Sequence, residues 1–424
     1  MTPTTPIILK RFVFLLLSVS LLACETPVVK SSAATNTTQD ELRIPDLLPR
    51  KGELAKAMEW QKTQQKVAEL KMRVASHPNE VKPRLQLATI YIAEARITGE
   101  HPYYYPAIHK ILDGVLLIDP KSFEATVFKA SVDLSQHQFA AAREMGEKAK
   151  TINPSNAYVY GILVDANVEL GQYQEAIAAS DKMQALKPSL EAYSRASYLR
   201  EIFGDYKGAI EAMKLAVEAG LPGSEPQCWS RNILGELYLK TGDLTKAEEQ
   251  FDANLALRPS YAFAMAGLAK IEHQRKNDAR ALQLLDSAAA ILPEFSFHEL
   301  MGDIYAERGE QQKALTKYAE VKTMLDQDAA SGHRVSLEMA KLSVKENQLD
   351  SAEKYAMEEY KIRPANIDVN KELAWIYFLK HDMTRAKDAL RVARSTNSKD
   401  PELLRRAAAI EKKQGWNSYM RIRG

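Results

Sequence analysis

Cysteine is scarce in this chain, with only Cys24 and Cys228 among 424 residues. Two cysteines can form at most one disulfide, so a disulfide framework is excluded as the basis of the fold. A zinc site built on a close cysteine pair is excluded too, because the two residues stand far apart in the sequence.

Catalytic motifs are also missing. The sequence contains no glycine-rich phosphate loop and no nucleophile elbow. Its eight histidines are scattered, and none stands four residues from another, so the helical metal-binding pair is absent. Carboxylate pairs such as Glu248-Glu249 are typical of solvent-facing helix surfaces. We therefore expect no catalytic residue, no metal site and no cofactor.

Charge of one sign is not in excess. Lysine and arginine number 57 against 55 acidic residues, a formal net charge of +2. A protein that binds nucleic acid through its phosphates usually shows a basic bias. We expect no nucleic-acid partner.

What the chain does have is a spacing of prolines. Seven prolines follow one another at intervals of 34, 34, 34, 37, 34 and 71 residues: Pro120, Pro154, Pro188, Pro222, Pro259, Pro293 and Pro364. The last interval equals 34 plus 37, as if one proline were missing near Gln327. A period of this length is typical of stacked helical hairpins.

Small residues repeat at the same period. Small residues stand twelve positions before five of the prolines: Ala142, Ala176, Ala247, Ala281 and Ala352. Twelve positions before four of these stand further small residues, Ala130, Gly235, Ala269 and Ala340. Helices cross closely only where side chains are small, so these positions predict helix contacts. In the clearest unit, Ile233 to Tyr238 predicts one amphipathic helix and Leu244 to Leu257 a second. Gly242 between them can take the left-handed conformation that ends a helix.

This pattern of small, aromatic and proline positions resembles the tetratricopeptide repeat family. The resemblance covers residues 79–415 and implies an all-α, right-handed superhelical solenoid of about nine helix-turn-helix units plus a C-terminal capping helix. The units are expected to start near Asn79, Phe123, Ala157, Leu190, Cys228, Ala262, Phe295, His333 and Ile367. A further N-terminal helix is expected in residues 50–78, and residues 416–424 form a tail.

The first 23 residues differ from the rest. Lys10-Arg11 precedes an apolar run of twelve residues, Phe12–Ala23, which is too short to span a bilayer as a helix. Residues 1–23 are therefore interpreted as an export signal. Without them, 55 basic residues balance 55 acidic ones, since 57 minus Lys10 and Arg11 leaves 55.

The sequence Leu21-Leu22-Ala23-Cys24 resembles the bacterial lipobox. That resemblance implies lipidation of Cys24 and cleavage before it; an ordinary signal peptide with a chance cysteine is the alternative. Glu25 then favours the outer membrane of a Gram-negative bacterium. Residues 24–49, rich in Thr, Ser, Ala and Pro at their start, read as a flexible tether. With Cys24 acylated, Cys228 would be a buried free thiol or, alternatively, a regulatory one.

First helices of such repeats line a concave groove that holds partner segments, again by resemblance. Partner-binding candidates on that face are Tyr158, Asp165, Glu169, Tyr198, Glu201, Trp229, Asn232, Glu236, Phe263, Asp303 and Glu307. Acidic residues with interspersed aromatics suggest a partner with a basic segment, although ordinary solvated helix faces explain the same residues.

One insertion interrupts the first unit around Thr98–Tyr105. Its three consecutive tyrosines, Tyr103, Tyr104 and Tyr105, cannot all be buried by one helix face. They are a second candidate binding edge, since tyrosine is favoured at interfaces. A loop folded back on its own unit is the other interpretation.

The sequence thus predicts an envelope-anchored scaffold that binds partner proteins or peptides along its concave face without catalysis. A glycan- or small-ligand-capturing lipoprotein similar to the starch-utilisation family is the alternative, with Tyr103–Tyr105 as its site. An envelope enzyme without a recognisable motif is a third class. A discrete polar pocket would favour the second or third class, and the oligomeric state stays open.

Overall fold

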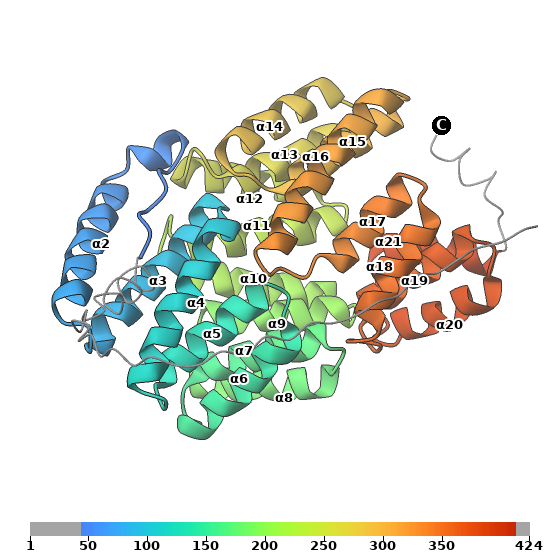
Figure 1. Ribbon diagram of the computed structural model, residues 1–424. Coiled ribbons are helices and arrows are strands. Elements are labelled where there is room, and N and C mark those ends of the chain that lie inside the picture. Colours follow the sequence, from blue (N-terminus) through green and yellow to red (C-terminus); the bar gives the residue numbers. More distant parts are fainter. Residues whose placement is uncertain (1–43, 413–424) are drawn as a thin grey trace, which may run out of the picture. The chain divides into compact units, whose positions relative to one another are not determined.

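The computed structural model describes residues 44–412, in which all regular structure is helical (Figure 1). This range holds twenty α-helices and one short 3-10 helix, η2 (Gly52–Ala55), and no strand. Helix α2 (Met58–Ser76) comes first and α21 (Pro401–Glu411) last. The expected all-α solenoid is confirmed.

Between these two, eighteen helices form nine consecutive pairs, as predicted. The pairs are α3 (Val81–Thr98) and α4 (His101–Ile118); α5 (Phe123–Ser135) and α6 (Phe139–Ile152); α7 (Ala157–Glu169) and α8 (Tyr173–Leu186); α9 (Leu190–Ile202) and α10 (Tyr206–Ala219); α11 (Glu225–Lys240) and α12 (Leu244–Leu257); α13 (Ala262–Gln274) and α14 (Asp278–Ile291); α15 (Phe295–Glu307) and α16 (Gln311–Ala330); α17 (Ser336–Lys345) and α18 (Leu349–Tyr360); α19 (Ile367–Leu379) and α20 (Met383–Ala393).

Each pair turns through one residue with positive φ. These residues are Gly99, His137, Gly171, Gly204, Gly242, Lys276, Gly309, Asn347 and His381. The left-handed conformation ends the first helix and lets the chain reverse, as predicted for Gly242. Side chains such as Asp243, which accepts from the Lys246 amide, cap the second helix and satisfy one of its free donors.

The small residues of the repeat form the contacts between helices. Every alanine of the two predicted rows has an exposed fraction of 0%. Gly235 of α11 and Gly267 of α13 both face the ring of Phe251, and a Cβ atom at either would lie 2.5 Å or less from it. One aromatic ring therefore joins consecutive units, and neither glycine can gain a side chain without moving it.

The tyrosines of the predicted insertion do not form a loop. They lie in the first turn of α4, and Tyr104 and Tyr105 are buried. The hydroxyl of Tyr103 donates to the Asp46 carbonyl, and the hydroxyl of Tyr104 accepts from the Leu48 amide. Tyr104 and Tyr105 pack in the core of their own unit, as the folded-back interpretation has it, but within a helix and not a loop. The segment before η2 contacts Tyr103 and Tyr104 and limits the exposed edge that the other interpretation needs.

The missing proline also has a structural outcome. Helix α16 has 20 residues, whereas α14, the second helix of the preceding unit, has 14. Without a proline near Gln327, nothing prevents the helical angles from continuing. The extra turns bring Asp328 and the following turn, residues 331–334, to α4 and the α5–α6 turn.

Turns of early units contact turns of late units, and we call these contacts the seam. The α5–α6 turn meets the α16–α17 turn: the Arg334 amide donates to the Gln136 carbonyl at 3.0 Å, and Gln138 Nε2 donates to the Gly332 carbonyl at 3.0 Å. The α7–α8 turn meets the α18–α19 turn, where Asn366 Nδ2 donates to the Glu169 carbonyl at 2.9 Å.

Hydrogen-bonded partners across the seam stand 194 to 198 residues apart in sequence. This separation is close to six repeats of the period. The early segment (α3–α10) and the late segment (α16–α21) therefore lie against each other. None of the described helices is both long enough and apolar enough to cross a membrane.

Candidate functional site

A cavity of about 470 Å³ lies between the early and late segments. Its walls come from α3, α5, α7 and α9 on one side and α17 and α19 on the other. Tyr158, Asp165, Glu169 and Tyr198 of the predicted site line it, so the structure brings these four together. Its volume lies within the range of small-ligand pockets.

The cavity wall is mostly charged, and most of its charges are already paired. Arg195 Nη2 lies 2.5 Å from Asp165 Oδ2, and Arg363 Nη1 lies 2.7 Å from Glu169 Oε2. Burial raises the pKa of Glu169, although Arg363 opposes the shift. Among the described residues, Arg96 and Lys341 are cavity cations without an ion-pair partner within 4.0 Å.

The buried cation of the seam is Arg363. Its side chain is 4% exposed and joins Glu169 of the early segment to Glu359 of the late one, at 2.7 Å each. The guanidinium also lies 5.0 Å from the centre of the Phe139 ring. Arg363 thus connects α7 and α18 through charge and the start of α6 through a cation–π contact.

Beyond the cavity, a row of aromatic rings crosses the first helices of the middle units. Trp229 of α11 and Phe263 of α13 lie edge to face, with ring centres 5.2 Å apart. Phe263 in turn contacts Phe297 of α15 at 5.6 Å. Trp229 is 41% exposed, so this row has an accessible aromatic edge.

A second row on these first helices consists of ion pairs between consecutive units. Pairs that contain a predicted site residue are Glu201 with Lys240 (2.5 Å), Glu236 with Lys270 (2.8 Å) and Asp303 with Lys345 (2.6 Å). Glu307 lies 3.2 Å from His273 Nε2, a contact that is an ion pair only when the imidazole is protonated. Each links one unit to the next, and Glu236 and Lys270 are one 34-residue period apart. The acidic character expected of this face is therefore neutralised within the chain.

Lys345 is the centre of the last of these pairs. Its ammonium group lies 2.9 Å from Glu299 and 2.6 Å from Asp303. Burial lowers the pKa of Lys345, but the two carboxylates outweigh it and raise the pKa above its usual value. Lys345 therefore stays charged.

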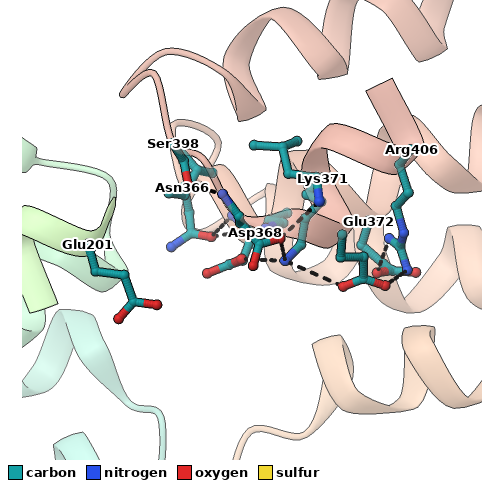
Figure 2. A network of polar contacts seen from close by, with 12 residues as sticks. Glu201, Asn366, Asp368, Lys371, Glu372, Ser398 and Arg406 are labelled. Atoms are coloured by element: carbon teal, nitrogen blue, oxygen red, sulfur yellow. Dashed lines mark hydrogen bonds and ion pairs between the residues drawn. The ribbon is translucent and has the colours of Figure 1, made fainter. Parts of the chain in front are cut away.

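A denser network of ion pairs lies at the C-terminal end of the solenoid, on α19 and α21 (Figure 2). Lys371 of α19 lies 3.1 Å from Asp368, and Arg406 of α21 lies 2.8 Å from both Glu372 and Glu402. Burial raises the pKa of Asp368, but Lys371 and Lys341 outweigh it, so that the pKa is lowered. Figure 2 also labels Glu201 of α9, which lies on a separate helix at one side of this network.

Three predicted site residues, Asn232, Tyr104 and Tyr105, are more buried than expected. Asn232 is 5% exposed, and its Oδ1 atom has no hydrogen-bond partner within the described chain. It lies between helices because α11 turns that side toward its neighbours. Tyr104 and Tyr105 belong to the core of the first unit and lie outside the residues that line the cavity.

Sequence reasoning missed the cavity residues contributed by other units, which include Arg96, Ser131, His137 and Arg363. No local signal marks them. Arg96, Ser131 and His137 reach the predicted residues from the two preceding units, and Ser131 Oγ lies 2.8 Å from Tyr158 Oη. Arg363 meets them only because the superhelix returns after nearly six repeats. Cys24 lies outside the described residues, and Cys228 is buried, where burial raises the pKa of its thiol.

Metal-binding side chains are not gathered in the part of the chain that the structure describes. No group of three or more His, Cys, Asp or Glu residues there could hold a metal ion. The residues that line the cavity offer ion pairs, hydroxyl groups and aromatic rings, which suit the binding of a polar molecule or chain segment.

Comparison with known proteins agrees with this architecture. Residues 171–335 match the family model described as a tetratricopeptide repeat-like domain. The mitochondrial import receptor subunit TOM70 of human is 25% identical over 223 residues, which make up 50% of this chain and 36% of the receptor. The rat and mouse receptors match over the same length. The chain spans about a third of the length of these curated relatives.

Among solved structures, a monomeric mutant of IFIT1 with Gppp-AAAA has a TM-score of 0.51 at 14% identity, covering 79% of this chain and 77% of that one. The human IFIT1 dimer with PPP-AAAA has a TM-score of 0.50 at 15% identity, covering 74% of this chain and 73% of that one. At such identities the likeness shows the fold alone. Sequence period, helix pairs and these matches together support a tetratricopeptide repeat protein, and the described chain has the tetratricopeptide repeat solenoid fold.

Proposed function

We propose that this protein is an envelope-anchored scaffold that captures segments of partner proteins on its concave side. The observation that carries the proposal is the composition of that side. An exposed aromatic edge at Trp229 and Phe263 leads along the first helices, and a polar cavity lies between the early and late segments. Aromatic anchors with oriented charge are what a specific protein interface requires.

The ion-pair row changes the expected chemistry of the partner. To reach the carboxylates of this row, a basic partner segment would have to displace the lysines that already pair with them, Lys240, Lys270 and Lys345. We therefore assign affinity first to the aromatic edge. The charge row then selects among partners, because exchanging one ion pair for another gains little net energy.

Small-ligand capture is the second candidate, and the cavity favours it. A polar pocket of about 470 Å³ between two segments is a suitable volume for a small molecule. The glycan site predicted at Tyr103–Tyr105 does not support it, because Tyr103 and Tyr104 hydrogen-bond with Asp46 and Leu48 of the chain itself and Tyr105 is buried.

Affinity capture from gently crosslinked membranes tests the scaffold. Two variants probe the two surfaces: Trp229→Ala removes the aromatic edge, and Lys341→Glu reverses a cavity charge that has no ion-pair partner within the described chain. Matched controls are Leu117→Ala and Lys207→Glu, which are exposed on other helices. Partners that depend on Trp229 but not on Leu117 support the scaffold.

Capture that is insensitive to both concave variants contradicts the proposed surface. If the chain captures no protein, but a small polar metabolite stabilises it and Lys341→Glu abolishes that effect, the second candidate replaces the first. Thermal denaturation with a metabolite library measures this outcome.

Lipid anchoring at Cys24 is tested separately. We expect a palmitate label on the wild-type chain in a Gram-negative host, and loss of both label and membrane association in Cys24→Ala. Several acyl chains hold a protein at a membrane where a single chain does not. Membrane association that persists in Cys24→Ala contradicts the anchor, and sucrose-gradient separation distinguishes outer from inner membrane.

A further inference from the structure

Three aromatic rings stack across the seam beside the cavity. His101 and Tyr105 come from the first turn of α4, and their ring centres lie 5.1 Å apart with planes 5° apart. His333, in the turn after α16, lies 5.8 Å from His101 and 5.4 Å from Tyr105. The stack therefore joins the early and late segments through side chains that can change charge.

One nitrogen of this stack has no hydrogen-bond acceptor for a proton among the described residues. His333 Nδ1 hydrogen-bonds with Ser331 Oγ at 3.1 Å, whereas its Nε2 atom is buried without a hydrogen-bond partner in the described chain. A protonated imidazole donates from both nitrogens. Protonation would therefore bury an unsatisfied, charged N–H group next to a second imidazole, which is costly.

We propose that the His101–Tyr105–His333 stack is an acid-sensitive latch that holds the seam closed over the cavity and releases it on acidification. This inference rests on the proposed function, because it concerns access to the same cavity. The release lets a partner segment reach His137 and Glu338, which line the cavity next to the stack.

The direction of the response follows from the two imidazoles. Burial, with Arg96 and His137 nearby, lowers the pKa of His101 from 6.5 to about 4. Burial, with His101 and His137 nearby, lowers the pKa of His333 from 6.5 to about 4. An open seam exposes both rings and restores ordinary pKa values, so the open form binds more protons. Closure is fully stabilised above pH 6.5 and is lost as the pH falls from 6.5 toward 4.

Other charged groups around the stack come from five elements. They are Arg96 of α3, His137 of the α5–α6 turn, Glu294 before α15, Asp328 of α16 and Glu338 of α17. Burial, with Glu294 nearby, raises the pKa of Asp328 from 3.8 to about 6. This carboxyl therefore favours the closed form on acidification, but it is one group against two imidazoles.

Double electron–electron resonance, which measures the distance between two spin labels, tests the latch on the full chain without any partner. Spin labels at Ala141→Cys on α6 and Gln327→Cys on α16, both exposed, report the seam from its two sides. Between pH 7.5 and 5.5 the population with the longer label separation should rise roughly twentyfold, given the two imidazole shifts and the opposing carboxyl. The double variant His101→Phe with His333→Phe keeps aromatic rings and should abolish the rise.

Two further variants sharpen the result. Asp328→Asn removes the opposing carboxyl and should enlarge the acid response several-fold, whereas His77→Phe, an exposed histidine on another element, should leave it unchanged. A label separation independent of pH overturns the latch. So does a response that survives the double variant, or one that coincides with loss of the helical circular dichroism signal. Since no partner is present, failure here leaves the capture experiment to decide the proposed function.

Discussion

Gly171 and Gly242 hold the same position in their units, but their surroundings differ. Both take positive φ between the two helices of a pair, at 76° and 82°. A Cβ atom on Gly171 would lie 2.5 Å from the carbonyl carbon of Ala365, across the seam, whereas one on Gly242 would meet no described atom within 4 Å. The first glycine is needed for the turn and for the contact between segments, the second for the turn alone.

The ion pairs of the seam and those of the middle units also differ in their surroundings. At the seam, Arg363 and Glu359 are almost fully buried, with side chains 4% and 3% exposed. In the middle units, Lys270 is 42% exposed and its partner Glu236 is 22% exposed. A repeat thus supplies equivalent positions, and the superhelix decides which of them carry tertiary structure.

The largest expected effect of a substitution is at Arg363. Arg363→Ala takes the 2.7 Å cation from both Glu359 and Glu169 and leaves Glu359 with only Arg334, at 3.4 Å. Removing one partner of a buried ion pair typically costs about 3 to 5 kcal/mol in the free energy of unfolding. Lys270→Ala breaks a partly exposed pair and should cost less than about 1 kcal/mol. Urea denaturation followed by circular dichroism measures both. Equal losses in the free energy of unfolding would show that the ion pairs of the seam stabilise the fold no more than those between the middle units.

Substitutions of Gly171 and Gly242 should have the next largest effect on stability. Any alanine in the left-handed conformation costs about 1 to 2 kcal/mol, so Gly242→Ala should lose that amount. Gly171→Ala should lose about 1 to 3 kcal/mol more, because its Cβ forces Ala365 away. Hydrogen exchange of the Ile367 amide, which donates to Tyr173 Oη across the seam, should also accelerate in Gly171→Ala only. Unchanged exchange there would contradict a role of Gly171 in the seam.

Trp229 should give the smallest effect on stability. Trp229→Ala loses one edge-to-face contact with Phe263, worth about 0.5 to 1.5 kcal/mol beyond area burial. If the aromatic edge is a binding surface, the same variant should lose most of its captured partners while the urea midpoint shifts little. A large destabilisation with intact capture would make Trp229 a structural residue.

Much of the architecture could be predicted from local pattern. The prolines, the small residues and Gly242 define units whose helices begin at Phe123, Ala157, Leu190, Ala262, Phe295 and Ile367, as expected. These features are local because a helix end depends on residues a few positions away. The contacts of Tyr103 and Tyr104 could not be predicted, because their partners, Asp46 and Leu48, lie more than fifty residues away.

The candidate site could be predicted only in part. Tyr158, Asp165, Glu169 and Tyr198 were assigned to one face by the family resemblance, and they do share the cavity. Asp165 pairs with Arg195 of the next unit, whereas the cation of Glu169 could not be assigned from the sequence, since Glu169 pairs with Arg363 and not with a residue of its own or the next unit. The burial of Asn232 likewise depends on how α11 is rotated against its neighbours.

The amino-acid sequence by itself determined the helical repeat, the left-handed turns and the small-residue contacts between neighbouring helices, because each depends on residues within one or two periods. The tertiary structure alone decided which early and late units meet. Small rotations between neighbouring units accumulate along a solenoid, so no single period encodes where the chain returns to itself. The seam, the cavity and the histidine stack across it all follow from that accumulated rotation.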